Sequence, residues 1–197
     1  NGSFEEVTAK AGIADVHGAR TGVFVDVDHD GDLDLVLAGN GQRTLYRNNL
    51  DGTFTDATTS YGFAGGGDAR AVVFGDFDGD GRIDLFVAAA SGNALLHNGG
   101  AQRFTDVTSA SGLAGNSIAA AVGDYNNDGF LDLFLIGSSG DATLWLNRGD
   151  GTFTRDARSA QTVAAVRGAA GAAARFVDYD NDGWLDLLVA SGSARGG

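Results

Sequence analysis

A nine-residue pattern that recurs four times is the feature that most constrains how this chain of 197 residues can fold. The pattern is Asp-x-Asp-x-Asp-Gly-x-x-Asp, with Asn in place of the second Asp in one copy, and Leu follows each copy. The copies begin at Asp26, Asp76, Asp124 and Asp178, which are 50, 48 and 54 residues apart. A fixed period of this length is typical of repeat architectures, in which one supersecondary unit is copied and stacked on its neighbour.

Two shorter segments keep the same period. A segment centred on Phe recurs at Phe4, Phe54, Phe104 and Phe153. A Leu-x-x-Asn segment ends at Asn48, Asn98 and Asn147, and the fourth repeat has no copy of it. These periods predict a single repeat domain over 1–197, with repeats at approximately 1–50, 51–99, 100–149 and 150–197.

Each repeat is expected to form four short strands. In the second repeat they are predicted at 69–77, 83–89, 93–98 and 103–107, because these runs are rich in Val, Phe, Leu and Thr and are bounded by Gly, Asn and Asp. Four strands per repeat of about 50 residues predict an all-β fold, a β-propeller built of four-stranded antiparallel blades. A β-solenoid is the alternative, although its rungs are usually shorter.

The spacing of the Asp residues favours calcium. Calcium takes six to eight oxygen ligands, and alternate residues of a tightly curled loop point inward. Gly at the sixth position permits the sharp turn. The predicted side-chain ligands are Asp26, Asp28, Asp30, Asp34, Asp76, Asp78, Asp80, Asp84, Asp124, Asn126, Asp128, Asp132, Asp178, Asp180, Asp182 and Asp186. The predicted backbone carbonyl ligands are those of Asp32, Arg82, Phe130 and Trp184. About four Ca²⁺ ions are therefore expected.

An EF-hand, a magnesium loop and an acidic turn without metal fit the Asp loops less well. An EF-hand would carry Glu at position 12, where these loops have Leu37, Val87, Leu135 and Val189. Magnesium demands stricter octahedral geometry. An acidic turn without metal would crowd several carboxylates together, which raises their pKa values unless a cation neutralises them. The third site is expected to be the weakest, because Asn126 replaces a carboxylate.

Charge and composition exclude several classes of protein. The formal net charge is −13, so binding to a phosphate backbone is not expected. No apolar run approaches the roughly 18 residues of a membrane span. There is no Cys, and the three His residues are scattered without a recognisable nucleophile. No catalytic residue is therefore predicted, and the protein is not expected to be an enzyme.

The Asp loops, together with the Gly-Thr-Phe-Thr-Asp segment at 52–56, resemble the FG-GAP/VCBS calcium repeats. Such repeats occur in integrin α-chain propellers, in bacterial secreted or surface proteins and in cartilage acidic protein. The resemblance implies a calcium-stabilised propeller, usually seven-bladed, outside the cell. Four loops and an incomplete last repeat indicate an incomplete or open propeller, with further blades of a parent chain as partners. A strand at 2–8 that closes the ring is the alternative.

The function expected from this resemblance is an extracellular interaction or adhesion module, with a protein or glycan ligand. Its location is expected to be secreted, on the cell surface or periplasmic. A carbohydrate-binding or carbohydrate-active module, either a lectin or a lyase, is the alternative. Arg148, Gly149 and Asp150 spell an integrin-recognition tripeptide, but they occupy a position where the repeat already requires a turn.

Overall fold

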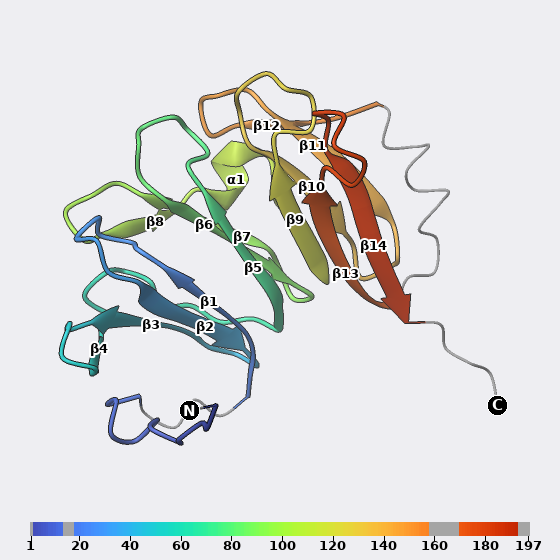
Figure 1. Ribbon diagram of the computed structural model, residues 1–197. Coiled ribbons are helices and arrows are strands. Elements are labelled where there is room, and N and C mark those ends of the chain that lie inside the picture. Colours follow the sequence, from blue (N-terminus) through green and yellow to red (C-terminus); the bar gives the residue numbers. More distant parts are fainter. Residues whose placement is uncertain (1, 14–17, 158–169, 193–197) are drawn as a thin grey trace.

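The computed structural model describes residues 2–13, 18–157 and 170–192. Within these residues the chain forms three four-stranded antiparallel sheets and one two-stranded sheet. The sheets follow one another in chain order and stand side by side as an open fan (Figure 1). The predicted all-β fold of propeller blades is thus confirmed, as is its open form. No helix of the described residues is long and apolar enough to cross a membrane.

Each complete blade is a meander in which consecutive strands pair. The first blade contains β1 (Ala19–Val25), β2 (Asp34–Gly39), β3 (Arg43–Asn48) and β4 (Phe54–Asp56). The second contains β5 (Ala69–Gly75), β6 (Asp84–Ala89), β7 (Ala94–Asn98) and β8 (Phe104–Asp106). The third contains β9 (Ala119–Gly123), β10 (Asp132–Ile136), β11 (Ala142–Asn147) and β12 (Phe153–Arg155). The strands of the second repeat begin and end within two residues of their predicted bounds.

The fourth blade has β13 (Ala170–Val177) and β14 (Asp186–Gly192), which pair with each other. The strand at 2–8, the alternative that would have closed the ring, is absent: residues 2–7 have no regular structure and 8–12 form turns. The backbone N–H of Phe54 donates to the carbonyl of Ala11 at 2.8 Å. This segment therefore lies against the outer strand of the first blade. The turn before β5 lies against β8 in the same way, through a hydrogen bond from the N–H of Phe104 to the carbonyl of Tyr61.

One short helix was not predicted. It is α1 (Thr108–Ser111), which lies between the second and third blades. The N–H of Ser111 bonds the carbonyl of Val107 at 2.8 Å, just as Tyr61 bonds Ala57 at 2.9 Å in the previous repeat. The helix is thus the same hydrogen-bonded turn that the previous repeat places before its next blade.

The first strand of each blade lies on the inner side of the fan, where neighbouring blades approach closely. A Cβ atom at Gly75 would lie 2.5 Å from Cδ1 of Leu131, and one at Gly123 would lie 2.8 Å from Cδ1 of Leu185. Both leucines belong to the Asp loop of the following blade. Glycine at the end of the inner strand therefore leaves room for the next loop to pack.

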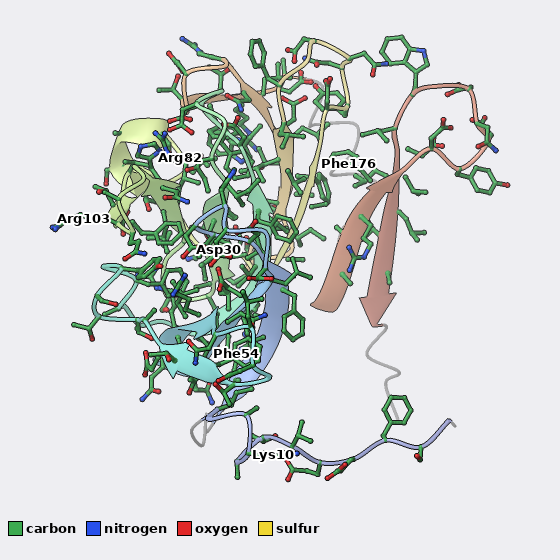
Figure 2. All side chains as sticks on the ribbon, turned by 60° about the vertical axis from the view of Figure 1, so that its left-hand side comes forward. Lys10, Asp30, Phe54, Arg82, Arg103 and Phe176 are labelled. Atoms are coloured by element: carbon green, nitrogen blue, oxygen red, sulfur yellow. The ribbon has the colours of Figure 1, made fainter. Side chains whose placement is uncertain are left out.

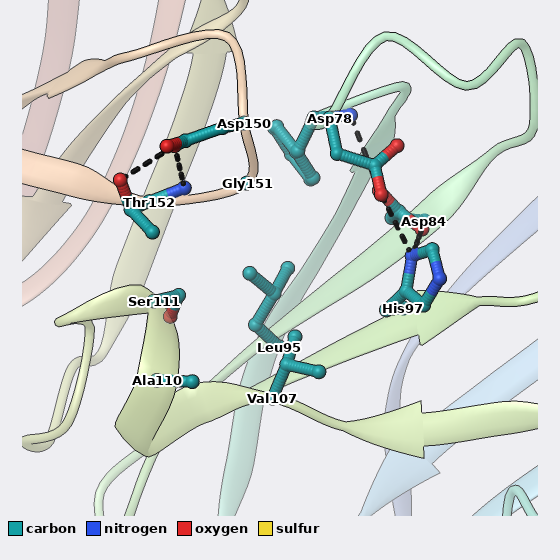
Figure 3. Close-up of a pocket in the computed structure, with 11 residues that line it drawn as sticks. Asp78, Asp84, Leu95, His97, Val107, Ala110, Ser111, Asp150, Gly151 and Thr152 are labelled. Carbon is teal, nitrogen blue, oxygen red and sulfur yellow. Dashed lines mark hydrogen bonds and ion pairs between the residues drawn. The ribbon is translucent and has the colours of Figure 1, made fainter.

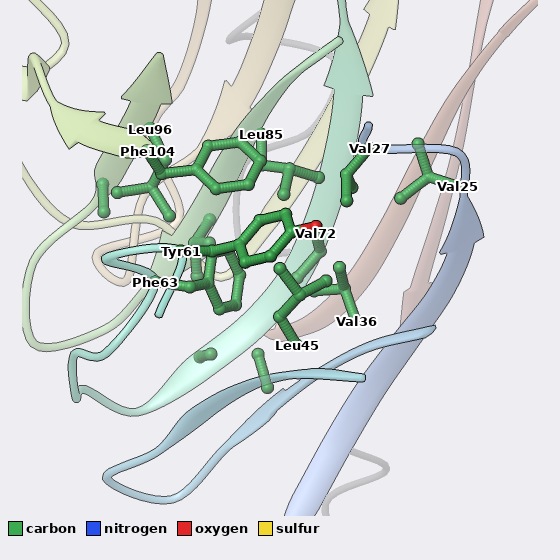
Figure 4. Close-up of a cluster of buried hydrophobic side chains, with 14 of the residues drawn as sticks. Val25, Val27, Val36, Leu45, Tyr61, Phe63, Val72, Leu85, Leu96 and Phe104 are labelled. Atoms are coloured by element: carbon green, nitrogen blue, oxygen red, sulfur yellow. The ribbon is translucent and has the colours of Figure 1, made fainter. Parts of the chain in front are cut away.

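The core lies between the blades. Between the first two blades, Val36 and Leu45 pack against Leu85 and Leu96, beside an edge-on pair formed by Phe63 and a partner from β8 (Figure 4). The next residue of β6, Phe86, points to the opposite side and joins the cluster between the second and third blades. Because successive side chains of a strand point to opposite faces, a sheet between two others buries apolar side chains on both of its faces.

The fourth blade buries one face only. Phe176 points from β13 toward the third blade and stacks on Tyr125 with ring centroids 6.2 Å apart (Figure 2). On the other side, the side chain of Leu188 is 62% exposed, whereas Phe86 and Phe134 at the same repeat position are 0% exposed. The structure thus ends on a sheet face of the kind that other blades cover.

Candidate metal centre

All four Asp loops join the first strand of a blade to the second, and they lie at the same edge of the fan (Figure 1). In the first loop the carboxylate of Asp26 accepts a hydrogen bond from the N–H of Gly31 at 3.0 Å. The other three loops repeat this bond at 2.9 to 3.0 Å. The glycine at position six has a positive φ in every loop, 95° for Gly31, which is a conformation that glycine adopts without strain. The predicted sharp turn at this position is therefore confirmed.

The last Asp of each of the first three loops accepts a hydrogen bond from the third strand of its blade and so anchors the loop to the sheet. Asp34, Asp84 and Asp132 are buried, and burial raises the pKa of all three carboxyl groups, that of Asp132 to about 6. The Oδ1 atom of Asp84 accepts from the N–H of Asn98 at 2.7 Å, and its Oδ2 atom accepts from Phe77 at 3.2 Å. The loop is thereby connected to the third strand of its own blade.

Three of the four predicted ligand sets contain a compact cluster of carboxylates. In each, three ligand oxygens lie within 4.8 Å of one another. The clusters are Asp26, Asp28 and Asp34; Asp76, Asp78 and Asp84; and Asp178, Asp180 and Asp186. In the third loop the amide of Asn126 donates to Asp128 at 2.8 Å, so one carboxylate of the set is replaced by a neutral group.

The first cluster contains carboxylate oxygens without a partner. The Oδ1 atoms of Asp26 and Asp28 are buried and accept no hydrogen bond. The side chain of Asp28 is only 9% exposed. A buried carboxylate oxygen with no donor costs about 1–3 kcal/mol, and a bound cation would remove that cost. The donor set therefore fits a hard divalent cation, for which carboxylate oxygens are the preferred ligands.

The other oxygen of Asp28 is held by two groups that the sequence analysis did not assign to the site. Arg47 on β3 donates to Asp28 and to Asp30 at 2.8 Å each, and the Tyr61 hydroxyl donates to Asp28 at 2.9 Å. Burial alone would raise the pKa of Asp28, but these hydrogen bonds outweigh it and hold the pKa below its usual value. The sequence signal for this contact was the position before the Asn of the Leu-x-x-Asn segment, which holds Arg47 in the first repeat and His97 and Leu146 in the next two.

A second missed group connects neighbouring loops. The amide of Asn98 donates to the carbonyl of Val27 at 2.8 Å, in the loop of the preceding blade, and to Ile83 in its own loop at 3.2 Å. Asn147 repeats the connection one blade later, to Phe77 at 2.9 Å. The recurring Leu-x-x-Asn segment therefore ends on an amide that joins two adjacent Asp loops.

The residues at position seven, predicted to bind through their carbonyls, vary in the direction of their side chains. Phe130 and Trp184 are 40% and 55% exposed, and their N–H groups donate to the Asp at position five. The N–H of Asp32 makes the same bond to Asp30. The guanidinium of Arg82 instead turns back to pair with Asp80. Binding through these carbonyls remains a prediction.

The Arg148–Asp150 tripeptide forms a turn. The carboxylate of Asp150 accepts from the N–H and the hydroxyl of Thr152 at 3.0 and 2.6 Å. These bonds lower the pKa of Asp150. Asp51 and Thr53 make the same pair of bonds two repeats earlier. The turn is therefore a structural part of the repeat.

Comparisons with solved structures give partial likenesses. An Agrocybe aegerita lectin, described as specifically recognising non-reducing terminal N-acetylglucosamine, is 26% identical, with a TM-score of 0.49 over 84% of this chain and 45% of that one. The Photorhabdus luminescens Tc holotoxin pore is 19% identical, with a TM-score of 0.48 over 91% of this chain and 9% of that one. The chain thus spans less than half the length of either protein. No curated protein matches it.

The match to a family model covers most of the chain. The model describes an FG-GAP-like repeat, and it matches residues 26–87, 76–135 and 124–189. Each match begins at the first Asp of a loop and runs into the second strand of the following blade. All four Asp loops and most of the strands lie within this span, and the chain belongs to the family of FG-GAP-like repeats.

Proposed function

We propose that this chain is a calcium-binding β-propeller module whose Ca²⁺ ions are structural. The observation that carries the proposal is the pair of buried, unpaired oxygens on Asp26 and Asp28 within a cluster of three carboxylates. Calcium would supply a positive charge to balance these carboxylate oxygens, and its flexible coordination suits a loop of alternating Asp residues. Four ions are expected, one in each loop.

Bound calcium would stabilise more than its own loop. In the second blade, Asp84 accepts from Asn98, and Asn98 in turn donates to the loop of the first blade. An ion that fixes Asp84 therefore also fixes the contact between neighbouring blades. At free calcium of about 2 mM and a Kd of about 0.1 mM, each site would add roughly 1.8 kcal/mol to the free energy of unfolding.

The module is proposed to act outside the cell, where calcium is abundant, as a non-catalytic support for interaction or adhesion. The described loop carboxylates already hold their own backbones, which favours a structural role over acid–base catalysis. Further blades of the FG-GAP type are proposed to cover the exposed face of β13 and β14, since Leu188 occupies a position that is buried in the second and third blades.

The proposal is tested by thermal unfolding of the chelator-treated protein, with metal removal verified by mass spectrometry. Removal of calcium should lower the Tm by many degrees, and added Ca²⁺ should restore it. Mg²⁺ at the same concentration is the control and should restore much less. An unchanged Tm in the verified metal-free protein would overturn the structural role of calcium.

A further inference from the structure

The third strand of the second blade places a histidine nitrogen beside the Asp loop. This strand, β7, directs His97 at the loop, whereas β3 and β11 place Arg47 and Leu146 at the same position. Arginine is a cation and leucine has no donor atom. Among the described residues, therefore, the third strand supplies a possible nitrogen ligand in the second blade alone.

We propose that the second loop binds a divalent transition-metal ion of the Zn²⁺ class through His97, Asp78 and Asp80. One ligand atom from each of these three side chains lies within 4.8 Å of the other two. Nδ1 of His97 is 3.1 Å from Oδ2 of Asp78 and 3.3 Å from Oδ1 of Asp84 (Figure 3). The imidazole ring is thus already turned toward Asp78, one of the proposed ligands, and toward Asp84 beside it.

The chemistry of the donors separates this site from a calcium loop. Calcium binds oxygen ligands, whereas imidazole with carboxylates is a donor set that suits zinc and related ions. The site needs the neutral ring with its proton on Nε2, which leaves the Nδ1 lone pair for the metal. Because Asp78 and Asp80 are also predicted calcium ligands of this loop, the two ion positions compete for both carboxylates.

The surroundings leave room for the remaining ligands. A cavity of about 200 Å³ adjoins the site and is lined by Asp78, Leu95 and His97, with Thr152 on the opposite side (Figure 3). Three protein ligands leave a coordination position open, which water from this cavity can fill. Arg82 donates to both oxygens of Asp80, but each carboxylate oxygen has a second lone pair for an ion.

The test is a calorimetric titration of the folded chain with Zn²⁺, first without added Ca²⁺ and then in excess Ca²⁺, because the two ions compete for Asp78 and Asp80. The wild-type chain should bind Zn²⁺, and His97→Leu, which installs the residue found at Leu146, should weaken binding by at least about tenfold. His29→Asn is the matched control. His29 lies in the first loop at φ 59°, where the third and fourth loops have Asn127 and Asn181, and its replacement should leave Zn²⁺ affinity unchanged.

A spectroscopic measurement on the wild-type chain keeps the test independent of how the variants fold. X-ray absorption of the Zn²⁺-loaded protein should contain a histidine nitrogen ligand. No Zn²⁺ binding, equal affinity in His97→Leu, or an oxygen-only shell would each overturn the proposal. The rise in Tm caused by calcium is measured on the same samples, so failure of the zinc site is distinguished from failure of the calcium loops.

Discussion

Asp28 is the residue at which the competing demands on a loop are clearest. Its Oδ2 atom accepts from Arg47 and Tyr61, while its Oδ1 atom is buried without a partner. The arginine thus neutralises part of the charge that an ion would otherwise neutralise. A calcium ion bound to the free oxygen would be repelled by the guanidinium of Arg47 a few ångströms away, so Arg47 competes with calcium for Asp28.

Replacing Arg47 by Leu, the residue at Leu146, should separate the two effects. Without calcium the variant should be less stable than the wild type, because Asp28 and Asp30 lose a donor of two charge-assisted bonds. With calcium the difference should shrink or reverse, because the repulsion is gone. Thermal unfolding in EDTA and in excess calcium measures both states, and an increase in Tm on adding calcium no larger than in the wild type would contradict the competition.

The third loop provides the complementary change. Asn126→Asp restores the carboxylate that the other loops have at this position. Calcium affinity of that loop should rise on the order of tenfold, about 1.4 kcal/mol, because the added charge acts directly on the ion. Calcium titration of this variant measures the effect, beside a control variant with Asn127→Gly, which installs the residue of the second loop at a position of positive φ. Unchanged affinity would exclude Asn126 as a ligand position.

At the scale of elements, the strands and loops could be predicted from sequence because each carries a local signal. The spacing of the Asp residues predicted the loops, and the apolar runs predicted the strands. The segment at 2–8 failed because its signal is incomplete: in other repeats, as where Phe54 pairs with Asn48, the Phe-centred strand needs the third strand of a sheet beside it. Phe4 has no such strand in the described part of the chain, and it is fully exposed.

Contacts between elements were beyond local sequence reasoning. The recurring Asn98 was visible as a pattern, but its bond to Val27 joins residues 71 positions apart. Its meaning depends on how two blades stack, which no single repeat determines. The same holds for Arg47, whose side chain reaches a loop 19 and 17 residues earlier.

The stacking role of this amide can be measured by Asn98→Ala. The change leaves the carbonyls of Val27 and Ile83 without their side-chain donor, at a cost of about 1–3 kcal/mol. Asn48→Ala is the matched control, since its amide bonds to Leu33 of its own loop at an exposed site. Urea unfolding should find the larger loss in Asn98→Ala, and equal losses would mean that the bond between blades adds nothing.

At the scale of the whole molecule, the acidic charge is concentrated at one edge. Sixteen of the 24 Asp residues lie within the four loops, and the rest of the chain has more basic than acidic groups. Four Ca²⁺ ions would change the formal net charge from −13 to about −5. The edge that carries the loops would thus lose most of its repulsion when the ions bind.

The last blade differs from the middle of the fan in how its apolar residues are covered, and this makes a prediction about the isolated chain. Leu188 is 62% exposed, so Leu188→Arg should change the free energy of unfolding by less than about 0.5 kcal/mol. Phe86→Arg, at the same repeat position but 0% exposed, should abolish folding, because it buries an unpaired charge. Circular dichroism during urea unfolding measures both.

Self-association adds a second measurement to the same pair. Since the face with Leu188 resembles the faces that neighbouring blades cover, exposed apolar area there favours contact between copies. Sedimentation should therefore find less association in Leu188→Arg than in the wild type. Strong destabilisation by Leu188→Arg would mean instead that this face is already covered within the chain, and the open arrangement of the blades would have to be abandoned.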